Sequence, residues 1–313
     1  MSSLSRSRML AATAAALVAA PHAAQAQTPQ ALRLIGVPTD DMTPVFSAVK
    51  AGLYRKAGID LELVPTSSGA VAVDAIMAGT YELGKGSAIS ILNAYLHGLP
   101  IRIIGNGPIW DEKTPFSMMI VATDSPAKDG AFFSGKTLCT AALRDLNQLS
   151  MCAWIDQNGG DSKSVNWVEV PNSAAGVAVG DRRFAATMLQ EPQLSAALAT
   201  GTVRAFAPAY NGIAAHFSTA LYFAQADWAA KNGKAIKSFL DATYAAARAT
   251  NGRRSDTAAM MSDVTKIPLT VYEKMARSNS STKSDPGLVQ PMIDVAAKYG
   301  YISRAFSAKD IFI

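Results

Sequence analysis

The sequence lacks the residue patterns that mark most enzymes. Its 313 residues include only three histidines and two cysteines, and none of them are spaced as metal ligands. There is no G-x-S-x-G elbow, P-loop, Rossmann glycine fingerprint or C-x-x-C pair. The carboxylates of Asp40, Asp41 and Glu191 have no recognisable nucleophile near them in the sequence. We therefore expect no catalytic residue, no metal ion and no cofactor, and we favour a protein that holds a ligand over one that transforms it.

The scarcity of cysteine leaves two alternatives open for Cys139 and Cys152. They can pair in an oxidising compartment, or they can be two small buried side chains. Cys139 is expected to end a strand and Cys152 to lie on the next helix, which makes the disulfide the less favoured alternative.

An excess of charge of one sign is also largely missing. There are 29 Lys and Arg residues against 24 Asp and Glu. Removing residues 1–26 takes away Arg6 and Arg8 and no acid, which leaves 27 against 24 and a net charge of +3. No cluster of basic residues goes beyond adjacent pairs such as the one in "GRRS" at 252–255, and no basic stripe has aromatic residues interleaved. We expect no binding to nucleic acid.

The first 26 residues have the organisation of a secretory signal peptide. Arg6 and Arg8 precede the uncharged run "MLAATAAALVAA", and Ala24 and Ala26 form a small-x-small cleavage site. The run is shorter than the ~20 residues that cross a bilayer. No cysteine stands at the cleavage site to carry a lipid. We expect removal of residues 1–26 and a soluble mature protein in the periplasm.

Short apolar strands and helical periods alternate along residues 32–107. Strict alternation of this kind predicts a parallel sheet with helices on both faces. Strands are expected at 32–38, 59–66, 81–86 and 101–107, and helices at 44–58, 70–79 and 88–98.

A second alternation begins after a strand at 117–124 that has no helix behind it, and it ends near 209. From about 226 the chain becomes almost wholly helical, so its helices must pack on the first lobe. We predict an α/β fold of two lobes with mostly parallel sheets, in which the chain crosses between lobes near 120–125 and near 220–226. Lobe 1 comprises residues 27–122 and 224–313, and lobe 2 residues 123–223.

Polar residues follow the predicted strands where each next helix begins. Ligands collect at the carboxyl ends of parallel strands, where helix N-termini offer free N–H groups and a partial positive charge. In the stretch "LGKGS", Gly84 and Gly86 allow close approach of the backbone to a ligand, and Ser87 can cap the following helix. "PTSSGA" and "VPTDDM" repeat this arrangement at two neighbouring strands. Ordinary helix capping explains each loop alone, but three together favour a binding site.

The second lobe offers comparable loops. Asp145 and Gln148 begin a helix in the manner of a capping box, with Arg144 just before it. The Arg144 guanidinium can face a carboxylate or sulfonate, or it can be a solvated surface group. Trp110 can form an apolar wall of the cleft or belong to the core. The expected ligand-binding residues are Thr39, Asp40, Ser67, Ser68, Gly86, Ser87, Trp110, Ala142, Arg144, Gln190 and Glu191.

Four segments together resemble a known family, the NMT1/THI5-like substrate-binding proteins of ABC importers, which include nitrate, taurine, sulfonate and thiamine-precursor binders. The segments are "AVKAGLYRKAGIDLELVP" (48–65), "DAIMAGTYELGKGSA" (74–88), "FSGKTLCTA" (133–141) and "LQEP" (189–192). The resemblance implies a type II-like periplasmic binding fold that closes on a small organic ligand by a hinge. It also implies delivery to an ABC permease of the inner membrane and no catalysis. We expect a monomer.

The resemblance does not carry the ligand over. "TAALRDLNQ" stands where small Ser, Thr and Gly residues are usual. Serine hydroxyls, helix N-termini, Lys85 and Arg144 favour an organic anion such as a carboxylate or sulfonate, whereas Asp40, Asp41 and Glu191 favour an amine or a protonated ring. We favour the anion. The alternative function is a secreted enzyme of pyrimidine-type metabolism on the same fold, although the cysteine-rich iron motif of the family's fungal enzymes is missing.

The cleavage site predicts that the exported protein begins at Gln27. Intact-mass or N-terminal analysis of periplasmic material should therefore show a chain that starts at this residue. Exported material that still carries residues 1–26 would contradict the prediction.

Overall fold

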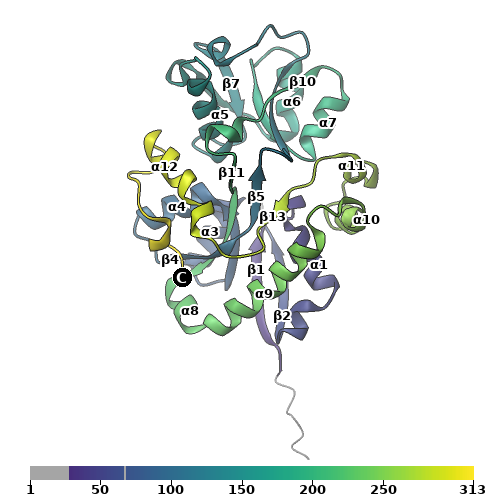
Figure 1. The fold of residues 1–313 in the computed structure, drawn as a ribbon, viewed down its shortest axis with the longest axis vertical. Helices are drawn as coiled ribbons and strands as arrows, with labels where there is room; N and C mark the ends of the chain where they lie inside the picture. Colours follow the sequence, from purple (N-terminus) through teal and green to yellow (C-terminus); the bar gives the residue numbers. More distant parts are fainter. Residues whose placement is uncertain (1–27, 67) are drawn as a thin grey trace, which may run out of the picture.

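The computed structural model describes residues 28–66 and 68–313. The predicted signal peptide and the predicted site residue Ser67 lie outside the described residues. Figure 1 shows two lobes one above the other, and both are of the predicted α/β class.

The lower lobe is built on a five-stranded sheet. In spatial order its strands are β2 (Ile59–Pro65), β1 (Gln30–Gly36), β3 (Leu83–Ser87), β12 (Ala220–Gln225) and β4 (Ile101–Asn106). β1 is parallel to β2 and β3, whereas β12 is antiparallel to β3 and β4. Because side chains alternate between the faces of a strand, the sheet contributes to two cores. One core contains α1 (Thr43–Lys50) and α9 (Gly233–Thr250), and the other contains α3 (Gly69–Met77) and α4 (Ala88–Leu96).

The upper lobe repeats this strand order. β9 (Thr187–Gln190), β6 (Ser117–Ala122) and β10 (Val203–Ala207) are paired antiparallel, and β7 (Thr137–Thr140) is parallel to β8 (Asn166–Glu169). A backbone hydrogen bond connects the β7–β8 pair to the β9–β6–β10 sheet: Cys139 N of β7 donates to Ala186 O, just before β9, at 3.1 Å. The resulting order, β8-β7-β9-β6-β10, matches β2-β1-β3-β12-β4. The helices are α5 (Leu146–Gln157), α6 (Asn172–Gly180) and α7 (Gln193–Ala199).

The chain passes between the lobes through a small three-stranded sheet. β5 (Pro108–Asp111) leads into β6, β11 (His216–Ser218) leads into β12, and β13 (Asn279–Ser280) pairs with β5. Figure 1 shows these strands between the lobes. Sheet membership places β6 in the upper lobe and all of β12 in the lower lobe. The chain therefore crosses between the lobes before β6 begins at Ser117 and before β12 begins at Ala220. Both crossings lie a few residues earlier in the chain than the predicted lobe boundaries after residues 122 and 223.

The two crossing strands begin at the edge where their neighbours end. The first residue of β6, Ser117, pairs with the last residue of β9, Gln190. In the other lobe the first residue of β12, Ala220, pairs with the last residue of β3, Ser87. The crossings therefore join the carboxyl edges of the two sheets, and those edges face each other.

The C-terminal helices pack mainly on the lower lobe, as the sequence predicts. They are α8 (Ala226–Lys231), α9, α10 (Arg254–Thr265), α11 (Leu269–Lys274) and α12 (Gln290–Lys298). α9 lies along α1, and α12 packs against α4. The end of the chain is hydrogen-bonded to β4, the edge strand of the five-stranded sheet. Ile103 N donates to Ile311 O at 3.0 Å, and Ile313 N donates to Ile103 O at 3.2 Å.

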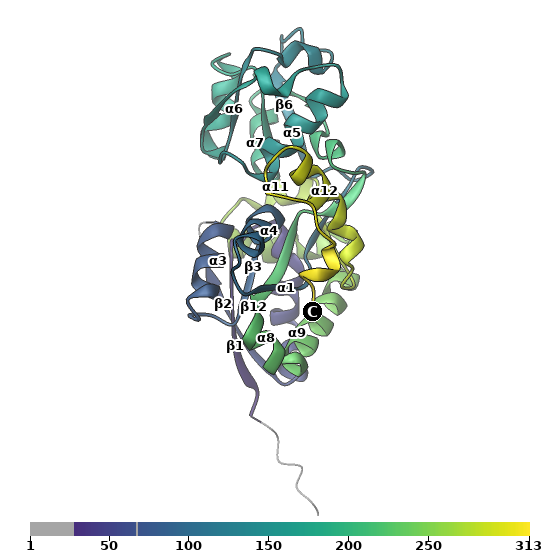
Figure 2. The same ribbon diagram turned by 90° about the vertical axis from the view of Figure 1, so that its left-hand side faces the viewer.

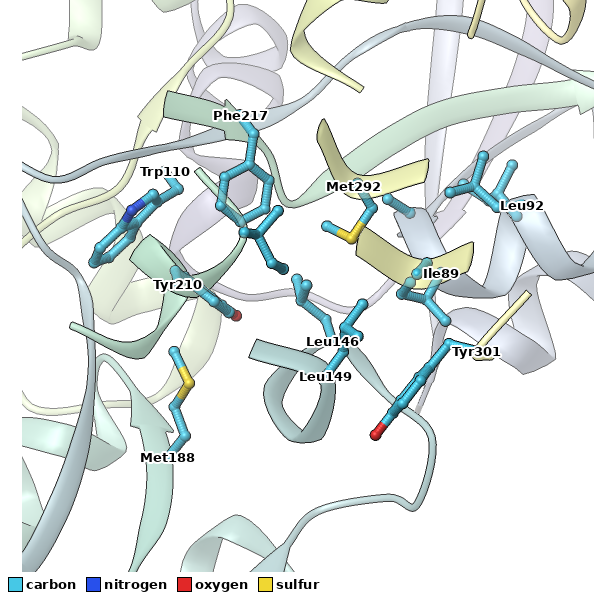
Figure 3. Packing of buried hydrophobic residues seen from close by; sticks show 14 of the residues in the cluster. Ile89, Leu92, Trp110, Leu146, Leu149, Met188, Tyr210, Phe217, Met292 and Tyr301 are labelled. Carbon is cyan, nitrogen blue, oxygen red and sulfur yellow. The ribbon is translucent and has the colours of Figure 1, made fainter. Parts of the chain in front are cut away.

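The largest hydrophobic core runs through both lobes. Leu146 and Leu149 of α5 and Met188 of β9 belong to the same cluster as Ile89 of α4 and Met292 of α12. Figure 3 shows these side chains converging from elements far apart in the sequence. The lobes are therefore in apolar contact on the side of α5 and α12.

Cys139 and Cys152 are both free and buried, so the less favoured alternative, a disulfide, is not formed. Burial raises the pKa of the Cys152 thiol to about 11. Among the residues that the structure describes, no helix is both long and apolar enough to cross a bilayer.

Gly84 does not face a ligand as expected, because it accommodates the ring of Phe223 on the adjacent strand. A Cβ built on Gly84 would lie 2.3 Å from Phe223 Cζ. The Phe223 ring is fully buried and has little room to move.

We therefore expect Gly84→Ala to lower the free energy of unfolding by about 1–3 kcal/mol through overpacking. Gly233→Ala is the matched control, because a Cβ there meets nothing within 4 Å and Ala favours the helix. Denaturant unfolding of both variants measures the difference. Equal stability of the two variants would contradict the packing assignment.

Candidate functional site

A cavity of about 910 Å³ lies between the two lobes, at the facing carboxyl edges of the sheets. Figure 2 shows the lobes from the side, with α12 between them. The lining includes residues from the loops after β1, β2 and β3 in the lower lobe and from those after β7, β8 and β9 in the upper lobe.

Four helices begin at this cavity. Residues in the first turn of α3, α4, α5 and α6 line it, and these helices follow β2, β3, β7 and β8. The unpaired N–H groups and the partial positive charge of a helix N-terminus favour an anion. N-termini from both lobes therefore act on the same space.

The loops before α3 and α4 are in direct contact. A Cβ on Gly69 would lie 3.0 Å from Ser87 N and 3.3 Å from Gly86 Cα, so only glycine fits there without a shift. The Ser68 hydroxyl accepts from Val71 N at 3.3 Å and caps α3. Ser87 precedes α4 as predicted, but its side chain makes no capping hydrogen bond. The Ser87 hydroxyl is therefore not committed to the helix.

A buried ion pair lies on the lower-lobe side of the cavity. Lys85 is only 5% exposed, and its ammonium group is paired with the Asp41 carboxylate. Asp41 also accepts from Thr39 Oγ1 at 2.6 Å. Burial of an ammonium group requires such a partner. The positive charge of Lys85 is therefore largely balanced by Asp41.

The upper lobe also contributes a cation and a carboxylate. Asp145 accepts from Gln148 N at 2.8 Å, as the predicted capping box requires, and from Thr140 Oγ1 at 3.2 Å. Burial raises the pKa of its carboxyl to about 6. The Arg144 guanidinium donates to Gly300 O and lies 5.1 Å from the centroid of the Tyr301 ring. Arg144 therefore already has partners within the protein.

Gln190 belongs to a hydrogen-bonded chain that joins two residues of the cavity lining through a buried tyrosine of the upper lobe. Its Nε2 donates to Tyr210 Oη at 2.5 Å, and Tyr210 Oη donates to Asn147 Oδ1 at 2.9 Å. Gln190 and Asn147 both line the cavity, so the buried Tyr210 hydroxyl holds two lining side chains in place.

The structure brings most of the predicted site residues together. Of those predicted, the residues that line the cavity are Thr39, Ser68, Gly86, Ser87, Ala142, Arg144 and Gln190. Whether they bind a ligand stays a prediction.

Asp40 and Glu191 lie beside the cavity rather than in its lining. They line a separate space of about 20 Å³. Asp40 forms a buried ion pair with Arg277 at 2.5 Å and accepts from Ser278 N at 3.1 Å. Glu191 accepts from Ser195 N at 3.0 Å. Burial raises the pKa of both carboxyls. These carboxylates therefore serve contacts within the protein, which corrects their expected place in the cleft.

Trp110 does not form a wall of the cavity. It is fully buried, and its Nε1 donates to Asn211 Oδ1 at 2.9 Å. Its ring packs edge-on against Tyr210 and Phe116, with centroids 5.1 and 5.8 Å away. Figure 3 shows Trp110 beside Tyr210 in the apolar core. Of the two alternatives, the structure shows the core.

Several lining residues were not among the predicted site residues: Asn93, His97, Asn147, Asn172, Thr219 and Tyr301. Asn172 begins α6 three residues after the last residue of β8, Glu169, so the rule that found Ser68 and Ser87 could have found it. Its Oδ1 is buried without a hydrogen-bond partner among the described residues. Tyr301 has no such signal, because its place in the cavity depends on packing of the C-terminal segment.

The described residues contain no group of three or more His, Cys, Asp and Glu side chains that could hold a metal ion. The side chains of the cavity are hydroxyls, amides, the Lys85–Asp41 ion pair, the side chains of Arg144, Asp145 and His97, and apolar groups. Such a set suits binding of a polar organic molecule with an apolar part.

Comparison with known proteins gives a family and a fold. The family model described as NMT1/THI5 like matches residues 39–252, which is more than half of the chain. No curated protein sequence matches the chain.

Three solved structures illustrate the shared fold. The periplasmic aliphatic sulphonate binding protein of Escherichia coli has a TM-score of 0.75 at 18% identity, over 91% of this chain and 92% of that one. The alkanesulfonate-binding protein of Xanthomonas axonopodis pv. citri, bound to MOPS, has 0.71 at 14% identity, over 91% and 98%. The periplasmic nitrate-binding protein of Synechocystis PCC 6803 has 0.70 at 15% identity, over 90% and 84%.

The raised pKa of Asp145 predicts a pH dependence of stability. The folded value of about 6 exceeds the ordinary value of 3.8, so the folded state holds this proton more tightly. The contribution is complete below about pH 4 and is lost as the pH rises through 6. Asp145→Asn keeps a capping side chain but cannot titrate.

The free energy of unfolding of Asp145→Asn, relative to the natural protein, should therefore rise between about pH 4 and 7. Denaturant titrations across this range measure the difference. A difference that is constant with pH would contradict the pKa assignment.

Proposed function

Because the chain belongs to the NMT1/THI5-like family, we propose that it is the solute-binding component of an ABC importer. It captures a small organic ligand between its two lobes and delivers it to a permease of the inner membrane. The family membership and the two-lobed fold support this role. It acts as a monomer in the periplasm, consistent with the signal peptide that the sequence predicts.

The observation that carries this proposal is the cavity that both lobes line. Its volume of about 910 Å³ lies within the range of pockets for small organic molecules. Lining residues from each lobe can contact one ligand at the same time, so the ligand stabilises the closed arrangement of the lobes. Binding by two lobes is the property that a permease needs to distinguish loaded from empty carrier.

We propose a small organic anion, such as a carboxylate or sulfonate, as the ligand. Lys85 is balanced by Asp41, and Arg144 and Asp145 have opposite charges, so the ionisable pairs contribute little net charge. The four helix N-termini add a partial positive charge, which attracts an anion. Ile89, Leu143, Leu146 and the Ala141–Ala142 pair supply apolar surface for the body of the ligand.

The proposal predicts that acids stabilise the protein and amines do not. A ligand at a hundredfold excess over its Kd adds about 2.7 kcal/mol to the free energy of unfolding, which a thermal-shift assay detects. The screen compares butanesulfonate, butyrate and butylamine, which are similar in size and differ in charge. Aromatic acids and pyrimidines are added to test larger and cyclic ligands. Stabilisation by the cationic compounds alone would refute the anion class.

Ser87→Ala tests the site with the best acid from this screen. Because the Ser87 hydroxyl lines the cavity without capping α4, its loss should weaken binding roughly three- to tenfold and leave stability nearly unchanged. Ser303→Ala is the matched control, since Ser303 is exposed and outside the cavity lining. Titration calorimetry that finds equal affinities for both variants would place the ligand elsewhere.

A further inference from the structure

The segment Tyr299–Tyr301, here called the C-terminal clasp, extends from the lower lobe to the upper one. It follows α12, which packs on α4. After it, the chain returns to the lower lobe, where Ile311 and Ile313 bond to the backbone of Ile103. The clasp is therefore anchored in the lower lobe on both sides.

The clasp makes polar contacts at both ends of α5 in the upper lobe. Before the first turn of α5, the Arg144 guanidinium donates to Gly300 O and lies 5.1 Å from the centroid of the Tyr301 ring. In the last turn, Asp156 Oδ2 accepts from Tyr299 Oη at 2.9 Å. The clasp thus spans the helix from one end to the other.

Apolar packing lies beneath these polar contacts. Leu149 of α5 and Met292 of α12 are both 0% exposed and belong to the core shared by the lobes. Figure 3 shows Leu146, Leu149 and Tyr301 next to one another. Movement of α5 away from α12 would expose these side chains to water, which is unfavourable.

We infer that Arg144 is a positioning residue that fastens the C-terminal clasp across the lobes rather than an anchor for the ligand's charge. Arg144 has φ 60°, a left-handed conformation that is costly for a side chain other than glycine. In this backbone conformation, the Arg144 guanidinium reaches the Gly300 carbonyl and the Tyr301 ring. The lobes separate only after the contacts of Arg144 and Tyr299 break, so these two residues control how often the cavity opens.

Distance measurement between the lobes, on the full mature chain without added ligand, tests this inference independently of the proposed function. Val71→Cys on α3 and Val177→Cys on α6 provide labelling sites that are 46% and 56% exposed in the natural protein. The native cysteines are buried. Double electron–electron resonance then reports the distribution of lobe separations.

We expect the population at long distances to increase roughly tenfold in Tyr299→Phe and in Arg144→Ala, because each loses a hydrogen bond in which one partner is charged. Arg144→Lys should give an intermediate increase, since it keeps the charge and loses the planar group. Tyr299 lies outside the cavity lining, so Tyr299→Phe separates the clasp from any contact with a ligand.

Arg102→Ala and Tyr95→Phe are matched controls within the lower lobe. Arg102 lies 5.7 Å from the centroid of the Tyr95 ring and donates to Ile101 O at 2.9 Å. Tyr95 Oη donates to Asp310 O at 3.4 Å. Arg102→Ala loses the same kinds of contact as Arg144→Ala, and Tyr95→Phe loses a tyrosine hydroxyl bond to a backbone carbonyl. Both variants should leave the distances unchanged. The inference is overturned if Tyr299→Phe and Arg144→Ala also leave them unchanged, or if the controls lengthen them equally.

Discussion

The antiparallel direction of the two crossing strands is the constraint on which the rest of the structure depends. β6 and β12 each begin at the edge where their neighbouring strands end. The connections between lobes therefore join two carboxyl edges, and the helices that follow β2, β3, β7 and β8 all begin at the space between the lobes. This topology alone places the cavity between the lobes and directs the partial positive charges of the four helix N-termini toward it. Side chains then decide which ligand enters.

Charges around the cavity are arranged to cancel. Lys85 pairs with Asp41, and Arg144 is held by the backbone and ring of the C-terminal clasp. Asp40 and Arg277 form a further pair beside the cavity. A buried charge is tolerated only with such partners. We base the proposal of an anionic ligand on the partial positive charge of the four helix N-termini, although Ser68 caps α3 and Asp145 caps α5.

The fold was predictable because its signals are local. The alternation of strands and helices, and the small polar residues after each strand, identified Thr39, Ser68, Gly86 and Ser87 as neighbours in one space. Contacts between residues distant in sequence could not be predicted. Arg144 donates to the carbonyl of Gly300, which is 156 positions away in the sequence, and no local pattern predicts such a contact.

The same reason explains the residues that were misplaced. Asp40 follows a strand as Thr39 does, but its partner is Arg277, 237 positions away. Trp110 was assigned to the cleft or the core by residue type alone, and its place depends on Tyr210 and Asn211, which precede β11. Sequence patterns locate the edge of a sheet, whereas the direction in which a side chain points depends on packing of the whole chain.

The central claim is that the protein holds a small organic acid in the cavity without changing it. The most direct test is mass spectrometry of the mature protein incubated with the acid that binds best, first in the native state and then after denaturation. Our account predicts a complex with one acid per chain and release of the same acid with its mass unchanged. A product of altered mass that accumulates with time would contradict it and favour a secreted enzyme on the same fold.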